Sequence, residues 1–300
     1  MLTANAYYRS RFHGKVYRIS LNGGMTCPNR DGTLDTRGCI FCSRGGSGDF
    51  AAPASYPISK QLEEAKKKVA AKLPKHPEAF AGYLAYFQAF TNTYAPVSYL
   101  RTIFSEALSD PEVVGLSIAT RPDCLPEACV SLLCELQLLF HKPIYVELGL
   151  QTIHEASAEF IRRGYPLSVY DNAVLRLKAA GLFVITHVIL GLPNETVDDM
   201  KATVLHLVSK DRRVHGIKLQ LLHILADTDL ASYYETASSE EFACMTPVAY
   251  AEVLKQLIPL IPEDVVVYRI TGDGPKKDLI APLWSADKKR VLNTLHKIGL

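Results

Sequence analysis

Three cysteines lie close together in the stretch Asn22–Gly48, which reads NGGMTCPNRDGTLDTRGCIFCSRGGSG. Eleven residues separate Cys27 from Cys39, and Cys39 and Cys42 form a Cys-x-x-Cys pair. Glycine, asparagine and aspartate crowd the stretch, which favours a shaped loop over a helix or a strand. Burying such a loop would leave backbone groups without partners. We therefore expect the thiolates, rather than packing, to organise this segment.

Three kinds of chemistry are open to these thiols. The simplest interpretation is three unrelated small apolar side chains, because free cysteine is commonly buried. A structural zinc site needs four ligands, and no fourth Cys or His follows in similar spacing; His13 is the nearest histidine. An iron–sulfur cluster is the third interpretation. Three cysteines would leave one iron of a [4Fe–4S] cube free to bind a small molecule, which indicates a catalytic centre.

The composition of the 300-residue chain is that of an ordinary globular protein, with 48% hydrophobic and 21% charged residues. A net charge of +2 is too small to indicate a nucleic-acid partner. The N-terminus lacks the apolar core of a secretion signal, and no apolar run approaches the ~20 residues that span a bilayer. Seven cysteines, an odd number, argue against a disulfide framework. We therefore expect a cytoplasmic protein without a membrane partner.

Apolar runs alternate with helical patterns along most of the chain, and these elements must position any site. Six runs predict strands: Lys15–Leu21, Tyr83–Phe90, Val113–Ala119, Ile144–Gly149, Phe183–Leu190 and Gly216–Leu222. Ser59, Ser168 and Thr196 are the expected N-caps of helices, the last two with an Asp three residues later as in a capping box.

Six strand–helix units with near-continuous apolar strands predict a parallel sheet buried on both faces. Right-handed crossovers curl such a sheet into a partial (β/α)6 TIM-like barrel, whose site lies at the C-terminal ends of the strands. Polar residues do gather at those ends, and we expect them to share one site with the cysteine loop: Gln88, Thr120, Glu147, Gln151, His187, Lys218, Gln220 and His223. Each of them taken singly could be a satisfied polar residue at a strand end.

A family resemblance rests on the same residues. The opening Cys-Pro-Asn-Arg-Asp-Gly at Cys27–Gly32 and the closing Gly-Cys-x-Phe-Cys at Gly38–Cys42, with ATRPD, ELGLQT and HVILGLP further on, resemble radical S-adenosylmethionine (SAM) enzymes. The resemblance is to the bacterial YhcC/YtqA group, which is related to the Elongator catalytic subunit, and runs from about Lys15 to Leu230. It implies a [4Fe–4S] cluster on Cys27, Cys39 and Cys42. It also implies cleavage of SAM to a 5′-deoxyadenosyl radical.

Residues for SAM follow from the same resemblance. The Gln on the fourth strand matches Gln151, an Arg in the following helix matches Arg163, and a polar residue on the fifth strand matches His187. These matches imply that the three residues line the SAM pocket.

Three further residues belong to the predicted cofactor site. The Gly-Gly-Thr-like stretch that relatives carry after the second strand corresponds here to Gln88–Thr91. An acidic residue that some relatives carry on the third strand falls at Ala119, beside Thr120, and the Glu147 carboxylate could accept both ribose hydroxyls instead. We therefore include Gln88, Thr120 and Glu147; the residue that acts on the substrate is left open.

The substrate is less defined by the sequence. Kinship with Elongator implies modification of the C5 substituent of the tRNA wobble uridine, with electrons from an external flavodoxin or ferredoxin. A tetrapyrrole or small metabolite is an alternative, as is a non-catalytic iron–sulfur or zinc sensor.

The chain after residue 230 is predicted to be an extension packed on the core of residues 1–230. Its first part, Asp229–Glu241, is polar, so we expect no tight apolar lid over the barrel. Pro247–Ile261 predicts a helix and Val265–Ile270 a strand, and Arg269 and Asp273 could face the barrel mouth.

Overall fold

The computed structural model describes residues 1–48, 51–239, 241–272, 274, 276–287, 291 and 293. Within these residues, eight strands form one curved sheet in the order β1-β9-β7-β6-β5-β4-β3-β2, and all neighbouring strands run parallel. The strands are β1 Leu2–Thr3, β2 Lys15–Leu21, β3 Phe80–Phe87, β4 Val113–Thr120, β5 Ile144–Gln151, β6 Phe183–Leu190, β7 Gly216–Leu221 and β9 Val266–Arg269. The predicted partial α/β barrel is confirmed, and its six predicted strands correspond to β2 to β7.

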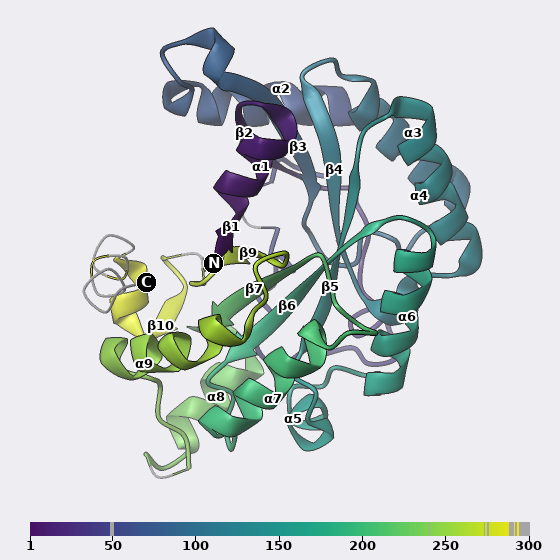
Figure 1. Ribbon diagram of the computed structural model, residues 1–300. Coiled ribbons are helices and arrows are strands. Elements are labelled where there is room, and N and C mark those ends of the chain that lie inside the picture. The colour runs from purple at the N-terminus through teal and green to yellow at the C-terminus, as the bar shows by residue number, and fades with distance from the viewer. Residues whose placement is uncertain are drawn as a thin grey trace.

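Helices cover the outer face of this sheet (Figure 1). Side chains from α2, α3, α4, α6, α7 and α9 share one hydrophobic core with the sheet. The helices are α1 Ala4–Phe12, α2 Ile58–Val69, α3 Val97–Ser109, α4 Glu127–Phe140, α5 Glu155–Phe160, α6 Leu167–Ala179, α7 Val197–Val208, α8 Asp229–Thr236 and α9 Pro247–Leu257. None of the helices described is long and apolar enough to cross a membrane.

Two of the three predicted N-caps are wrong. Pro57 and Pro166 occupy the N-cap positions of α2 and α6, so Ser59 and Ser168 lie inside the first turn of each helix. Proline has a fixed φ suited to a helix start, and each helix begins directly after it. The third prediction is confirmed, since Thr196 and Asp199 form a capping box at α7.

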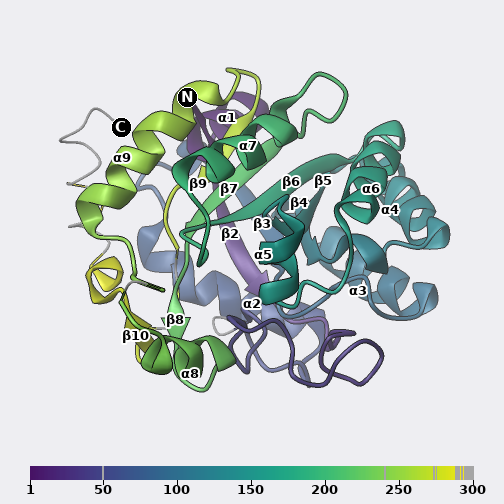
Figure 2. The ribbon, with the colours of Figure 1, turned by 90° about the horizontal axis from the view of Figure 1, so that it is seen from below.

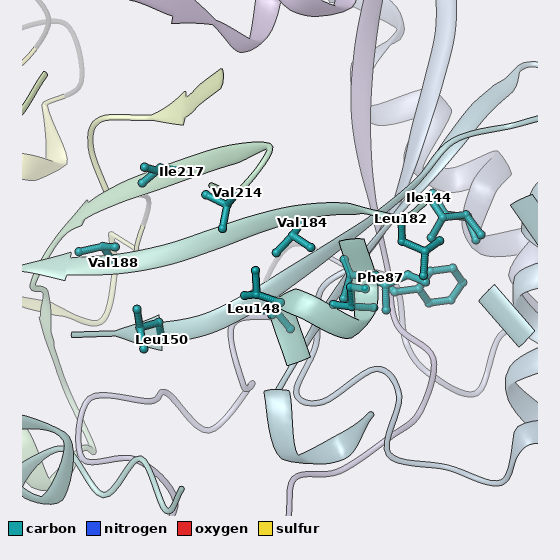
Figure 3. Close-up of a cluster of buried hydrophobic side chains, with 14 of the residues drawn as sticks. Phe87, Ile144, Leu148, Leu150, Leu182, Val184, Val188, Val214 and Ile217 are labelled. Atoms are coloured by element: carbon teal, nitrogen blue, oxygen red, sulfur yellow. The ribbon is translucent and has the colours of Figure 1, made fainter. Parts of the chain in front are cut away.

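Alternation along the strands separates the core from the barrel interior. In β5, Ile144, Val146, Leu148 and Leu150 belong to the core beneath the helices, whereas the odd-numbered residues between them face inward. Figure 3 shows this core, with Leu148 and Leu150 of β5 near Val184 and Val188 of β6. The same period places a polar or charged side chain on the inner face of each strand from β2 to β7: Arg18, Tyr86, Ser117, Glu147, His187 and Lys218.

An aromatic cluster lies at the N-terminal ends of the strands. Tyr8 of α1 packs against Tyr145 at the start of β5 and against Tyr268 of β9, with ring centroids 6.2 and 5.9 Å apart. Helix α1 is missing from the sequence prediction, because nine residues with little apolar pattern give a weak signal. This helix covers the bottom of the barrel, so the opposite end remains for a site.

The segment after β7 packs beside the C-terminal ends of the strands. It contains the antiparallel pair β8 Ile224–Leu225 and β10 Leu279–Ala281, with α8 between them in sequence. The polar reading of Asp229–Glu241 is wrong in part, because Leu230 and Ala231 of α8 are buried in a second core with Ile40 of the cysteine loop. In Figure 2, α8 and the dark-purple cysteine loop lie next to each other along the lower edge, and α5 lies directly above the loop. Division of the chain at residue 230 stays a prediction.

Candidate functional site

One cavity brings together all nine of the predicted cofactor residues. Its volume is about 160 Å³, and it lies where the cysteine loop meets the C-terminal ends of the strands. It is lined by the three cysteines and, from β3 round to β6, by the six polar residues of the prediction: Cys27, Cys39, Cys42, Gln88, Thr120, Glu147, Gln151, Arg163 and His187. A larger hollow of about 1160 Å³ lies outside the loop and is lined by none of these residues. We therefore place the site by its chemistry and not by size.

Hydrogen bonds within the cysteine loop give it a defined shape. The backbone N–H of Arg30 donates to the Cys27 carbonyl at 2.8 Å, and its guanidinium donates to the carbonyls of Cys42 and Ser43 at 2.8 and 2.7 Å. Gly38 has φ +80°, and a Cβ there would lie 2.8 Å from Nε of Arg30. A glycine is thus required where Arg30 ties the two ends of the loop together.

Contacts from distant parts of the chain fix the loop to the barrel. The backbone N–H of Ile40 donates to the Ile161 carbonyl at 3.3 Å, and the N–H of Leu230 donates to the Ile40 carbonyl at 2.9 Å. Beside these bonds, Arg162 forms an ion pair with Asp229 at the first residue of α8. The loop is therefore held between α5 and α8.

The cysteine thiols are close enough to influence one another. Burial raises the pKa of Cys39 to about 12, the nearby Cys42 and Cys27 add to the rise, and Arg121 opposes it. Among the described residues, no three His, Cys, Asp or Glu side chains converge closely enough to bind a single metal ion. The three thiols that line this cavity are of the ligand type that an iron–sulfur cluster would take.

A buried ionic cluster forms the floor of the cavity. The Glu147 carboxylate is fully buried and accepts from Arg18 at 3.0 Å and His187 at 2.7 Å, and from Ser117 and Lys218. Burial alone would raise the pKa of Glu147, but the charges of Arg18 and Lys218 hold it well below its ordinary value. Glu147 is thus ionised with both oxygens engaged.

His187 is a neutral imidazole held by two neighbours. The Gln220 amide nitrogen lies 3.0 Å from Nδ1 of His187, so Nε2 carries the proton that is donated to Glu147. Burial and then the Lys218 charge lower the pKa of His187 to about 4, despite the attraction of Glu147. The ring therefore presents a fixed tautomer at the cavity wall.

The remaining predicted residues differ in how much of each side chain is free. The Arg163 guanidinium donates to the carbonyls of Tyr165 and Thr152 at 2.9 and 2.7 Å and pairs with Glu155 at 3.1 Å, so it serves the protein fold. By contrast, Oε1 of Gln151 is buried without a hydrogen-bond partner among the described residues. An unpaired buried acceptor beside a cavity fits a ligand that donates an N–H or O–H group.

A second cavity adjoins the first, and the walls of the two include residues that the sequence analysis did not single out. Arg121 lines the first cavity and Tyr86 lines both. The second, of about 170 Å³, adds Gln220, His223 and Arg269, so Arg269 lies where predicted; Asp273 lies outside the described residues. Arg18 was also missed, although a lone arginine in the apolar strand KVYRISL is a signal of an inward-facing charge.

Comparisons with known proteins agree on one family. A model of the radical SAM superfamily matches residues 36–207, and a radical SAM C-terminal domain model matches residues 214–298. The uncharacterized protein YtqA of Bacillus subtilis is 41% identical over 98% of this chain and 88% of its own length. Elongator complex protein 3 of Schizosaccharomyces pombe is 27% identical over 65% of this chain and 35% of its own.

The solved structures are similar in fold. The structure of the archaeal Methanocaldococcus infernus Elp3 matches with a TM-score of 0.69 at 18% identity, over 96% of this chain and 64% of that one. At this identity the likeness speaks for the fold alone. The fold in question is the curved parallel sheet with the loop at its C-terminal edge.

Proposed function

The chain belongs to the radical SAM superfamily, whose members bind a [4Fe–4S] cluster and SAM, and we propose that Cys27, Cys39 and Cys42 hold the cluster here. The observation that supports this is the single cavity in which these thiols meet the polar ends of four parallel strands. Bound together, the cluster and SAM supply a 5′-deoxyadenosyl radical. The protein is an enzyme of this superfamily, and the barrel provides orientation and shelter from water.

The polar residues of the cavity divide between binding and support. We propose that Gln151, Gln88 and Thr120 contact SAM, with the unpaired Oε1 of Gln151 accepting a hydrogen bond from it. His187 offers a ring of fixed tautomer. Because Glu147 already has four partners, we propose that it orients His187 and does not accept ribose hydroxyls.

Arg163 belongs to the supporting group. Its guanidinium joins α5 to the end of β5 through the Thr152 carbonyl and Glu155, so we propose that it shapes the wall beside SAM. This role differs from a direct ion pair with the SAM carboxylate.

We propose tRNA as the substrate, with the wobble uridine as the modified base and a flavodoxin- or ferredoxin-type protein as the electron donor. Similarity to Elongator complex protein 3 supports the substrate class. A base must leave the anticodon stack to reach a radical inside a barrel, and this needs an accessible mouth. Helix α8 packs beside the cysteine loop through Leu230 and Ala231, and we propose that it leaves this mouth open.

Two measurements test these steps separately. Reconstituted, reduced protein should convert SAM to 5′-deoxyadenosine, whereas a Cys27/Cys39/Cys42→Ala variant should not. Nucleosides from tRNA of a strain lacking the gene should show an altered mass at the wobble uridine, restored by the wild-type gene and not by the triple variant. Identical profiles in the two strains would reject tRNA while leaving the radical SAM activity in place, and would favour a metabolite substrate.

A further inference from the structure

Two buried side chains besides the cysteines face the thiols. Asn29 is 2% exposed, and its Nδ2 lies 3.5 Å from Sγ of Cys39 and 2.7 Å from the carbonyl oxygen of Arg162. The amide is thus oriented by a backbone acceptor while a hydrogen points to the sulfur. Hydrogen bonds to sulfur are one of the means by which proteins adjust an iron–sulfur centre.

Arg121 brings a positive charge to the same place. Its side chain is 10% exposed, and it lines the cavity together with all three cysteines. Nε and Nη2 pair with the Asp123 carboxylate at 2.9 and 2.7 Å, and the guanidinium lies 5.0 Å from the centre of the Tyr165 ring. The arginine is therefore fixed, and its charge is partly balanced by a carboxylate that does not line the cavity.

Gly164 leaves room for both side chains at once. Its φ is +81°, and a Cβ at this position would lie 2.9 Å from Oδ1 of Asn29 and 3.3 Å from Nη2 of Arg121. Asn29 and Arg121 are consequently neighbours across one glycine. Because Gly164 has no side chain, the Asn29 amide and the Arg121 guanidinium can lie together beside the thiols.

We propose that Asn29 and Arg121 raise the reduction potential of the [4Fe–4S] cluster and so favour its one-electron reduction by the external donor. The proposal rests on the ligation by Cys27, Cys39 and Cys42 put forward above. Reduction adds one negative charge, which a nearby cation and an N–H donor stabilise more than they stabilise the oxidised form. Because both groups are buried, water screens them little.

A redox titration of the reconstituted protein tests this, with the reduced cluster followed by electron paramagnetic resonance in the absence of SAM and tRNA. Arg121→Gln should lower the ratio of reduced to oxidised cluster at a fixed potential about tenfold, equal to about 59 mV for one electron. Arg121→Lys keeps the charge and should recover most of this change. Asn29→Leu should shift the ratio in the same direction as Arg121→Gln.

The direction in which Asp123→Asn shifts the reduction potential is the decisive result. This substitution removes the carboxylate that balances Arg121, so the potential should rise, whereas damage to the fold has no reason to produce opposite shifts at two paired residues. Arg176→Gln, outside the cavity on α6, is the matched control and should leave the potential unchanged.

The possible results separate the two proposals. An unchanged potential in Arg121→Gln, or a fall in Asp123→Asn, would overturn the role of Arg121. If Arg121→Gln loses its iron, the sign of the Asp123→Asn shift still decides. A wild-type protein that binds no iron would overturn the cysteine ligation itself.

Discussion

Replacing Glu147 by Gln should destabilise the fold strongly, because the carboxylate is the common acceptor of the barrel interior. Removing one partner of a buried ion pair typically costs about 3–5 kcal/mol. We expect the lower end, about 3 kcal/mol, for two reasons. Arg18 is 23% exposed and can reach water, and burial together with the Arg18 charge lowers the pKa of Lys218 well below its ordinary value, so Lys218 can lose its proton. Adding Lys218→Met should restore part of the stability.

The assay is urea unfolding of the cluster-free protein between pH 7 and 5. The pKa of Glu147 is held below its ordinary value of 4.5, so its contribution is present above that pH and is lost only as the pH falls through the folded-state value. The Glu147 carboxylate should therefore add no pH dependence to the difference between wild type and Glu147→Gln over this range. Loss of the Lys218 proton in the variant should make the difference grow as the pH falls, because only the unfolded chain then binds that proton. Glu135→Gln, whose pair with Arg101 is 54% exposed on the glutamate, is the control and should change stability by less than about 1 kcal/mol. A loss below about 1 kcal/mol for Glu147→Gln would refute the reasoning.

Three further predictions follow from the structure. Burial and then the charge of Arg11 lower the pKa of His215 to about 4, below its ordinary value of 6.5. Between these two pH values only the unfolded chain binds the proton, so the free energy of unfolding falls as the pH falls. His215→Phe should reduce this pH dependence, measured by urea unfolding at pH 7 and 5, by up to about 1.4 kcal/mol per pH unit. Asp229→Ala removes the ion pair with Arg162 and should lower the free energy of unfolding by under about 1 kcal/mol, since the carboxylate is 58% exposed. Iron release from the reconstituted variant should nevertheless be faster than from the wild type. Equal release rates would show that α8 does not hold the loop. Cys42→Ala should lower the iron content from about four per chain to nearly none, and retention of four irons in elemental analysis would exclude this cysteine as a ligand.

Much of the fold could be predicted because burial on both faces leaves a simple pattern in parallel strands. The bounds of β2 and β6 agree with prediction at both ends. Strand β3 begins three residues before its predicted start at Tyr83, because Phe80 pairs with Lys15 at the start of β2. Pairing between strands is a tertiary property, so a local pattern does not reveal it. Helix α8 was missed because only Leu230 and Ala231 of its eight residues are buried, and two neighbouring apolar residues do not make a helical pattern.

The sequence could predict which residues line the candidate site, but not which of their polar atoms remain available to bind a ligand. Parallel strands bring their C-terminal ends to one edge, so polar residues at those ends meet whatever their separation in sequence. The sequence does not reveal that the guanidinium of Arg163 is used by backbone carbonyls, or that Glu147 has four partners. Arg121 and Asn29 lie within motifs that the sequence analysis quoted, yet their closeness depends on Gly164 from another part of the chain.

Hydrogen bonds and packing organise the cysteine loop, whereas the sequence analysis expected the thiolates to do so. Arg30 and Gly38 close the loop from within, while Ile161 and Leu230 fix Ile40 from two distant parts of the chain. Positions 161 and 230 become neighbours only when β5, β6 and β7 have paired and their crossovers have formed. The spacing of the three cysteines is therefore set by the complete barrel together with the start of α8. This explains why a motif with eleven residues between its first two cysteines can present all three thiols to one cavity.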